Sequence, residues 1–306
     1  MTGPPAATAA VRLAVRRCLP DGPVVAAVSG GADSLALAAA LAFERPGSGA
    51  LVVDHALQPG SAEVAALAAE QCRGLGLTAR VLTAPAPLTD TSAPRSSGGP
   101  EAVAREVRYR LLDQHSGEAA VLLGHTRDDQ AETVLLGLAR GSGTRALAGM
   151  AARRARYLRP LLDVSRSTAR QACLEAGLTP WDDPHNEDPA YARVRARQAL
   201  ALLEQALGPG VSEALARTAR LARQDADALD ALAEPTDDVG RLEGLPPALL
   251  GRSLKAWAEQ ETGRSVTGAH VDALAALITG WHGQGPVALP GGGSVRRHGG
   301  RLAFDP

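Results

Sequence analysis

A Ser-Gly-Gly-Ala-Asp-Ser hexapeptide at residues 29–34 has the composition of an anion-binding loop. A short apolar run, residues 24–28, precedes it, and strong helix formers follow at residues 35–41. This order predicts a strand-to-helix turn, in which adjacent glycines let a ligand approach the backbone closely. The first amides of a helix have no internal partners and carry the positive end of the helix dipole, so the turn is suited to phosphate. The predicted phosphate-binding residues are Ser29, Gly30, Gly31, Ala32, Asp33 and Ser34.

The same loop departs from two common nucleotide motifs. It contains no lysine, which a Walker-type loop requires, and its two glycines are adjacent, whereas a dinucleotide fingerprint spaces three. It offers instead two hydroxyls and the carboxylate of Asp33. A carboxylate beside phosphate is explained when a divalent cation bridges the two, so Asp33 is a candidate metal ligand.

A group of acids follows another apolar run, residues 119–123. Asp128 and Asp129 lie four and three positions before Glu132, so the three carboxylates converge near the start of a predicted helix. A cationic ligand, a metal ion or capping of the helix dipole would each explain such acids, although capping explains one acid better than three. His125 lies just before this group.

Two further segments carry polar residues that could reach a ligand. Asp54 and His55 end an apolar run at residues 50–53, and the carboxyl ends of parallel strands are where open α/β sheets bind ligands. In the predicted helix 101–112, Glu101, Arg105 and Arg108 share one face. That face is either a surface ion-pair row or a charged face turned toward a triphosphate.

Length and composition narrow the class of protein. The chain has 306 residues, 45% of them hydrophobic, and a formal net charge of -1. No apolar run approaches the length of a membrane-spanning helix, so we expect a cytoplasmic protein with no membrane partner. Cys18, Cys72 and Cys173 are scattered, which favours buried thiols over a disulfide or zinc framework.

Basic charge is concentrated in the middle of the chain. Residues 141–224 contain 13 arginines and 8 acidic residues. Five of these arginines follow one another with no acid between them, namely Arg145, Arg153, Arg154, Arg156 and Arg159. They form either a surface that contacts nucleic-acid phosphates or an ordinary solvated face.

Strands and helices alternate in the first half of the chain, which predicts a doubly wound α/β fold with a mainly parallel sheet. That topology brings residues 29–34, 54–55 and 124–132 to the carboxyl edge of the sheet. After an expected linker at residues 234–244, the sequence predicts a smaller, mostly helical C-terminal domain ending in a hairpin within residues 287–304.

In this order the motifs resemble the PP-loop ATP pyrophosphatases, a fold class similar to the adenine nucleotide alpha hydrolases. Among them they look most like the tRNA(Ile)-lysidine synthetase family. The segments that carry the resemblance are residues 29–34, 53–55, 101–109, 124–133, 140–143, 159–162 and 181–184. In this chain Thr126 and Arg127 follow His125, where the family often has a second histidine.

The resemblance implies a two-step ligation. ATP adenylates the C2 carbonyl oxygen of the wobble cytidine of tRNA(Ile) with the CAU anticodon and releases pyrophosphate, and the amine of free L-lysine then displaces AMP. By this resemblance the loop at 29–34 holds the triphosphate, Asp33 engages it through Mg²⁺, and Arg105 reaches it. Asp128, Asp129 and Glu132 hold the lysine ammonium, and Asp54 and His125 line the nucleotide site. The central arginines contact tRNA phosphates.

The resemblance also implies a division of the chain into a PP-loop ATP-binding catalytic domain at 1–200, a helical connector at 201–233 and a small tRNA-binding domain at 234–306. The oligomeric state stays open, and a homodimer is one option. Two alternatives also stay open: another PP-loop enzyme that thiolates a tRNA base, and a nucleotide-binding module without catalysis. The absence of paired cysteines argues against thiolation.

Overall fold

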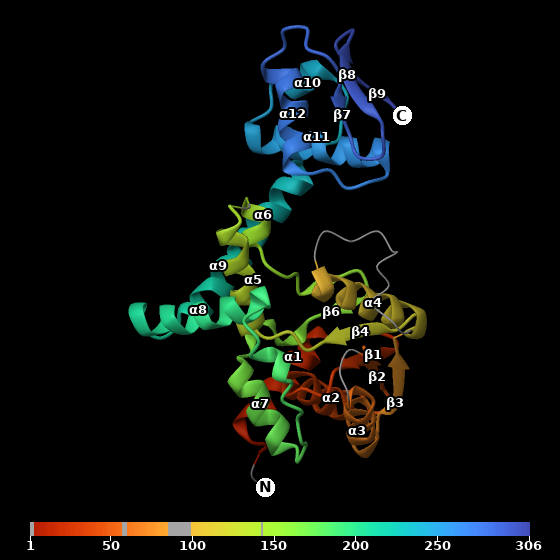
Figure 1. Cartoon of the computed structure of the whole chain (residues 1–306), viewed down its shortest axis with the longest axis vertical. Coiled ribbons are helices and arrows are strands. Elements are labelled where there is room, and N and C mark those ends of the chain that lie inside the picture. The colour runs from red at the N-terminus through yellow and green to blue at the C-terminus, as the bar shows by residue number, and fades with distance from the viewer. Residues whose placement is uncertain (1–2, 57–59, 85–98, 142) are drawn as a thin grey trace. The chain divides into compact units, whose positions relative to one another are not determined.

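The structure, a computed structural model, describes residues 3–56, 60–84, 99–141 and 143–306, without the side chains of residues 99–102. The chain divides into two compact units, Met1–Arg220 and Leu221–Pro306. Figure 1 shows the elements of each unit.

A six-stranded sheet forms the centre of the first unit, in the strand order β3-β2-β1-β4-β6-β5. All neighbouring strands are parallel except β5 and β6, which confirms the predicted mainly parallel sheet. The sequence did not reveal β5 and β6, because a two-residue strand carries no periodic signal. The strands are β1 (Val24–Val28), β2 (Gly49–Asp54), β3 (Thr78–Thr83), β4 (Ala120–Leu123), β5 (Arg153–Arg154) and β6 (Tyr157–Leu158).

Helices cover both faces of this sheet. Those that precede β6 are α1 (Ala6–Cys18), α2 (Ala32–Glu44), α3 (Ser61–Gly74), α4 (Gly99–His115), α5 (Arg127–Ala139) and α6 (Thr144–Leu147). Those that follow it are the 3₁₀ turn η1 (Pro160–Asp163), α7 (Arg166–Glu175), the 3₁₀ turn η2 (Pro184–Asn186), α8 (Ala192–Leu207) and α9 (Val211–Leu232), the last of which spans the boundary between the units.

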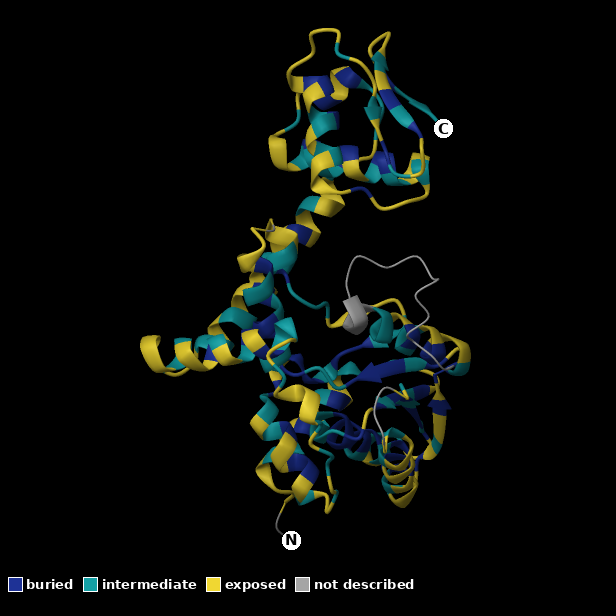
Figure 2. Cartoon of the chain, in the orientation of Figure 1, coloured by how far each residue is buried: buried dark blue, intermediate teal, exposed yellow. Residues whose placement is uncertain are grey.

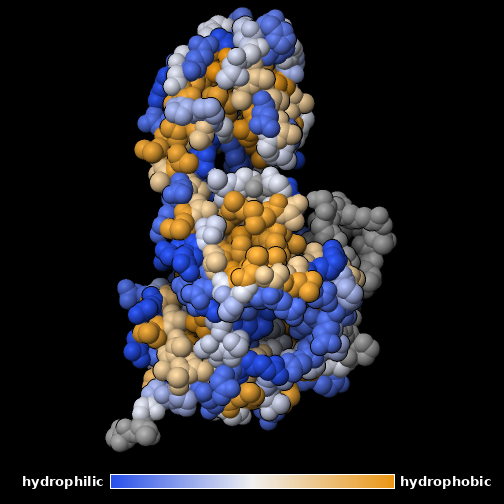
Figure 3. Space-filling model, turned by 90° about the vertical axis from the view of Figure 1, so that its left-hand side faces the viewer, coloured by the Kyte–Doolittle hydropathy of each residue, from blue (hydrophilic) through white to orange (hydrophobic). Residues whose placement is uncertain are grey.

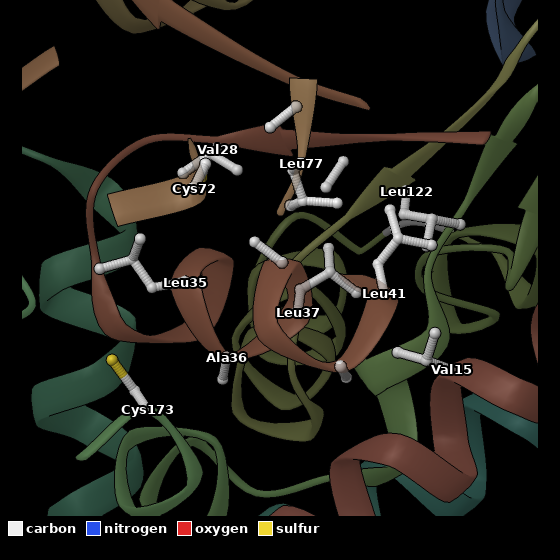
Figure 4. Packing of buried hydrophobic residues seen from close by; sticks show 14 of the residues in the cluster. Val15, Val28, Leu35, Ala36, Leu37, Leu41, Cys72, Leu77, Leu122 and Cys173 are labelled. Carbon is white, nitrogen blue, oxygen red and sulfur yellow. The ribbon is translucent and has the colours of Figure 1, made fainter. Parts of the chain in front are cut away.

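Successive residues of β1 pack against different helices, and this shows on which face of the sheet each helix lies. Val24, Ala26 and Val28 belong to one buried cluster with residues of α1, α2, α3 and α7. The intervening Val25 and Ala27 pack against a second cluster, to which α4 contributes. Successive residues of a strand point to opposite faces, so α2 and α4 lie on opposite faces of the sheet. Figure 4 shows the first cluster, and Figure 2 shows the buried strands between the two layers.

The strand order creates a switch point between β1 and β4. The chain builds β1, β2 and β3 in one direction and then returns to place β4 on the other side of β1. In open α/β sheets, ligands bind at the carboxyl ends of the strands beside such a switch point. The loop after β1 leads into α2 there, and Gly124, the residue directly after β4, lies against the backbone of Ser34 in the first turn of α2.

Large apolar side chains are exposed on α5 and α8, among them Leu138, Leu202 and Leu207. Figure 3 shows a hydrophobic patch on the face that it draws. No helix among the described residues is long and apolar enough to cross a membrane.

The second unit has its own core. It contains α10 (Val239–Glu243), α11 (Pro247–Thr262), α12 (Gly268–Thr279) and an antiparallel sheet of β7 (Val287–Ala288), β8 (Ser294–His298) and β9 (Arg301–Asp305). The predicted linker at residues 234–244 is wrong over α10, because Val239 and Leu242 are buried in this core. The expected hairpin is present and has β7 as a third strand.

Gly124 controls how closely β4 can approach the start of α2. A Cβ at this position would lie 3.1 Å from the backbone nitrogen of Ser34. We therefore expect Gly124→Ala to push the two segments apart, to lower the free energy of unfolding by about 1–3 kcal/mol and to weaken the ATP binding that the resemblance implies. Urea denaturation and ATP titration measure the two effects.

The matched control is Gly74→Ala in α3, where a Cβ would meet no atom within 4 Å. This variant should bind ATP normally and be equally or slightly more stable, because alanine favours the helix. Equal ATP affinity in the two variants would contradict the role given to Gly124.

Candidate functional site

The loop between β1 and α2 presents backbone amides toward the carboxyl edge of the sheet. Gly30 has a φ of 87°, a conformation that favours glycine, and Gly31 is the N-cap of α2 without a side-chain cap. Ser34 Oγ accepts a hydrogen bond from the Ser29 amide at 3.1 Å and donates one to the Gly31 carbonyl at 2.9 Å. The Trp181 amide donates to the Gly30 carbonyl at 3.0 Å. The conformation of the loop is thus held by the side chain of Ser34 and by the backbone of Trp181, which lies far along the chain.

Arg166, the first residue of α7, gathers the predicted acids into one group. Its Nη2 donates to Asp129 Oδ1 at 2.7 Å and to Glu132 Oε1 at 3.0 Å. Its Nε lies 3.8 Å from Asp33 Oδ2. Its backbone amide donates to Asp128 Oδ2 at 2.8 Å. The structure therefore brings together all four predicted carboxylates from the phosphate loop and from α5.

Asp129 performs two tasks. Its Oδ2 accepts hydrogen bonds from the amide and the hydroxyl of Thr126, which completes a capping box at the start of α5. Its Oδ1 pairs with Arg166. Burial alone would raise the pKa of Asp129, but the charge of Arg166 and the hydrogen bonds from Thr126 outweigh it and lower the pKa. Asp129 is therefore an ionised carboxylate at neutral pH.

Glu132 is the most enclosed of these acids, with 1% of its surface exposed. Its Oε1 accepts from Arg166 and, at 2.9 Å, from Arg197 Nε on α8. Its Oε2 is buried and has no hydrogen-bond partner. Because a buried carboxylate oxygen is costly to leave unpaired, this oxygen is a free acceptor for a cationic ligand.

The cluster is short of positive charge. Three carboxylates, Asp33, Asp129 and Glu132, lie beside the guanidinium groups of Arg166 and Arg197, and a fourth, Asp128, accepts from the backbone amide of Arg166. Burial and then the negative charge of Asp129 raise the pKa of Asp33 to about 7, although Arg166 acts in the opposite direction. Asp33 Oδ1 is also buried without a partner. A further cation at this position would be stabilised by the excess negative charge.

A divalent cation bound through Asp33 is compatible with this geometry. No group of three or more histidines, cysteines or acids in the described parts of the chain is arranged as a protein-only metal site. Mg²⁺ in nucleotide sites commonly uses one or two carboxylates together with substrate phosphates and water. The unpaired Oδ1 of Asp33, in the first turn of α2, supplies such a ligand.

The remaining predicted residues lie outside the acid cluster. Asp54 is 5% exposed, and its Oδ1 accepts from the Ala56 amide at 2.9 Å, so in this structure it shapes the turn after β2. Arg105 donates to Tyr109 Oη at 3.1 Å. Burial lowers the pKa of His125 to about 3, so this side chain is neutral, and its Nδ1 has no hydrogen-bond partner. The side chain of Glu101 lies outside the described part of the structure.

Arg166 and Arg197 are site residues that were not predicted from the sequence. A signal for Arg166 exists: Ser165 caps α7 by accepting from the Thr168 amide, and an arginine then begins the helix. A cation at a helix N-terminus opposes the helix dipole, so its presence indicates nearby acids. Arg197 lies within a helix among other arginines and gives no such signal.

The five central arginines do not form one exposed surface. Arg153 and Arg154 are exposed on β5. Arg156 donates to Ser116 Oγ at 2.9 Å. Arg159, by contrast, is 6% exposed and is not part of any surface patch. It donates to the Ala151 carbonyl at 2.8 Å, so its place is in the interior of the unit.

Comparison with known proteins agrees with this geometry. Residues 9–204 match the family model of the PP-loop domain, and residues 238–303 match the TilS substrate binding domain. The first match makes the chain a PP-loop protein. The U34-tRNA thiolase NcsA from Methanococcus maripaludis, solved with its [4Fe-4S] cluster, shares the fold with a TM-score of 0.58 at 19% identity, covering 71% of this chain and 79% of that one.

Curated relatives narrow the class further. Proteins named tRNA(Ile)-lysidine synthase from Salinispora tropica and Thermobifida fusca are 52% and 51% identical to this chain. The alignments cover 97% and 99% of this chain, and 96% and 98% of the relatives. The chain belongs to the tRNA(Ile)-lysidine synthase family.

The raised pKa of Asp33 predicts a pH-dependent cost to stability. Between about pH 4 and pH 7 the folded protein holds a proton on Asp33 that the unfolded chain has lost, so stability falls as pH rises through this window. Asp33→Asn should remove this fall and raise the free energy of unfolding at pH 8 by roughly 1–3 kcal/mol. Urea denaturation at pH 5 and pH 8, without nucleotide or divalent cation, measures it.

Asp21→Asn, at an exposed turn, is the control and should leave the pH dependence unchanged. If the free energy of unfolding of Asp33→Asn depends on pH in the same way as that of Asp21→Asn and of the unmodified chain, the raised pKa of Asp33 is contradicted.

Proposed function

We propose that this chain joins lysine to C2 of the wobble cytidine of tRNA(Ile) with the CAU anticodon, in an ATP-dependent ligation that proceeds through an adenylated tRNA and releases AMP and pyrophosphate. Membership of the tRNA(Ile)-lysidine synthase family supports this reaction. The structural observation that carries it is the position of Asp33, which belongs to the phosphate loop and also lies within reach of Arg166 in the acid cluster. A nucleotide phosphate site and a cation site are therefore contiguous.

The first step needs a stabilised triphosphate. The C2 carbonyl oxygen attacks the α-phosphorus, the bond to the bridging oxygen breaks, and pyrophosphate leaves with its electron pair. The uncapped amides at the start of α2 are the groups that would bind the phosphate oxygens, as they are oriented before the ligand arrives. Mg²⁺ held by Asp33 would neutralise charge on the departing pyrophosphate.

The second step needs a positioned amine. The lysine nitrogen attacks C2, the C2–oxygen bond breaks, and AMP leaves with that oxygen. Glu132 Oε2 is a buried acceptor without a partner, so it suits the ammonium form of lysine and is placed to accept the proton that this nitrogen gives up before it attacks. Arg166 and Arg197 hold Glu132 through its other oxygen, so the carboxylate is fixed before lysine binds.

The domain roles belong to the same proposal. We assign ATP and lysine binding to the catalytic domain at 1–200, a connecting role to residues 201–233, and tRNA binding to residues 234–306. The match of residues 238–303 to the TilS substrate binding domain supports the last assignment. A homodimer and a cytoplasmic location stay predictions.

Base thiolation is not favoured as the activity. The three cysteines are free; Cys72 and Cys173 are buried. Burial raises the pKa of both of these thiols to about 11. A reactive sulfur carrier needs an accessible thiol with a low pKa, and these two have neither property.

The direct test incubates the full chain with an unmodified tRNA(Ile) transcript, ATP and isotopically labelled L-lysine, followed by mass analysis of the nucleosides. We expect a labelled cytidine adduct that requires ATP. A transcript with uridine at the wobble position is the matched control and should stay unlabelled. No adduct on the cognate transcript would overturn the proposal, and a sulfur-sized mass increase in a reaction supplied with sulfur would favour thiolation.

Glu132→Gln separates amine binding from nucleotide binding. The substitution keeps the shape of the side chain and removes its charge, so the KM for lysine should rise by about tenfold or more while the affinity for ATP changes little. Steady-state lysidine formation and ATP titration measure the two quantities.

The exposed Glu106→Gln on α4 is the control and should alter neither quantity. An equal loss of lysine and ATP binding in Glu132→Gln would indicate that Glu132 is a metal ligand and would contradict its role in binding the lysine ammonium.

A further inference from the structure

A short segment between α7 and η2, residues 178–183 and here called the strap, is anchored to two helices. Its anchor on α3 is Gln71, whose Nε2 donates to the Thr179 carbonyl at 3.1 Å and whose Oε1 accepts from the Thr179 amide at 2.7 Å. Its anchor on α7 is Arg170, whose Nη1 and Nη2 donate to the two carboxylate oxygens of Asp182 at 2.7 and 2.9 Å. The strap is therefore fixed on both sides of the residues that lie between Thr179 and Asp182.

Between the two anchors the strap contacts the phosphate loop, where the Trp181 amide donates to the Gly30 carbonyl at 3.0 Å. That carbonyl and the N–H of Gly31 belong to one peptide group, and in a trans peptide they point in opposite directions. The bond from Trp181 therefore holds the carbonyl oxygen on the side of the strap and the Gly31 N–H on the side away from it. Since an N–H binds phosphate and a carbonyl oxygen repels it, the orientation of this peptide group matters for an anion site.

The two glycines of the loop do not fix this peptide group by themselves. Glycine adopts positive and negative φ about equally well, so a peptide group between two glycines can turn over at little steric cost. Gly30 has a φ of 87°. The side chain of Ser34 bonds the Ser29 amide and the Gly31 carbonyl, and neither of these belongs to the peptide group that joins Gly30 to Gly31. Its orientation therefore depends on the bond from Trp181, which comes from outside the loop.

Gln71 joins the strap to the same helix that lies against Gly30. A Cβ at Gly30 would lie 3.4 Å from Val64 Cγ1 and 3.5 Å from Ala68 Cβ, both on α3. Val64, Ala68 and Gln71 are spaced by four and three positions, so they share one face of that helix. One face of α3 thus contacts the loop directly at Gly30 and, through Gln71, holds the strap whose amide bonds the Gly30 carbonyl.

We propose that Gln71 is a positioning residue for ATP: through the strap it fixes the peptide group between Gly30 and Gly31 with the N–H directed at the phosphates. This role deepens the proposed function and rests on it, because the phosphates are those of the ATP that the ligation consumes. A loop that is fixed before the ligand arrives loses less conformational entropy on binding, so Gln71 raises the affinity for ATP without touching it. The pair of Arg170 and Asp182 acts in the same way from α7.

The experiment compares Gln71→Met with Glu70→Met in the full chain. Methionine keeps the length and helix propensity of glutamine but cannot form the two hydrogen bonds to Thr179, and Glu70 is the exposed neighbour on α3. Because Thr179 is exposed, the expected change is moderate: the Kd for ATP should rise about threefold to tenfold in Gln71→Met and less than about twofold in the control. The KM for lysine at saturating ATP should stay unchanged, since the substitution leaves the acid cluster intact.

Amide hydrogen exchange without nucleotide separates positioning from general support of the fold. In Gln71→Met, exchange should accelerate in peptides that cover residues 29–34 and 178–183 and should stay unchanged in a peptide that covers β4, residues 120–123. Faster exchange in all three peptides, unchanged exchange in residues 29–34, or a Kd for ATP equal to that of the control would each overturn the role of Gln71. If Gln71→Met does not fold, Asp182→Ala releases the strap from α7 and carries the same measurements with the same expected results.

The ATP titration and the exchange measurement do not depend on catalysis. If both change as expected in Gln71→Met but the unmodified chain forms no lysidine, the proposed function fails and the positioning role stands. If lysidine forms on the cognate transcript while Gln71→Met binds ATP as the control does, the positioning role fails and the proposed function stands.

Discussion

The ion pairs of Arg166 are the interaction on which the candidate site depends. One guanidinium lies within 4.0 Å of carboxylate oxygens from α2 and from two positions of α5. Without it, Asp33, Asp129 and Glu132 would face one another as like charges in a partly enclosed space, where their repulsion is strong. Arg166 and Arg197 leave the cluster with more carboxylates than guanidinium groups. The structure therefore holds a negatively charged site in a fixed shape, ready for an added cation.

The fold brings three helix N-termini to this point. Asp33 lies in the first turn of α2, Asp128 and Asp129 lie in the first turn of α5, and Arg166 begins α7. The positive ends of these helix dipoles stabilise the acids and would equally stabilise phosphate oxygens. Close approach of β4 to α2 depends on Gly124, which has no side chain to separate them. The switch point of the sheet and Gly124 thus determine how far the start of α2, which would bind the phosphates, lies from the acids of α5.

Much of this arrangement could be predicted from local patterns. The loop at residues 29–34 and the acids at 128–132 each follow an apolar strand and begin a helix, so sequence alone places them at one edge of the sheet. Their partners could not be predicted in this way, because Arg166 and Arg197 reach Glu132 from 34 and 65 positions later in the chain. Arg159 was misplaced for the same reason. Its neighbours, Ala151 and Tyr109, are brought to it by two-residue strands and by packing.

The most direct test of the central claim is a crystal structure of the full chain with a non-hydrolysable ATP analogue and L-lysine. The phosphates should contact the amides at the start of α2, and a lysine amine should lie about 3 Å from a carboxylate oxygen of Asp128, Asp129 or Glu132. A lysine amine bound elsewhere, with these acids still paired only to Arg166 and Arg197, would contradict the account.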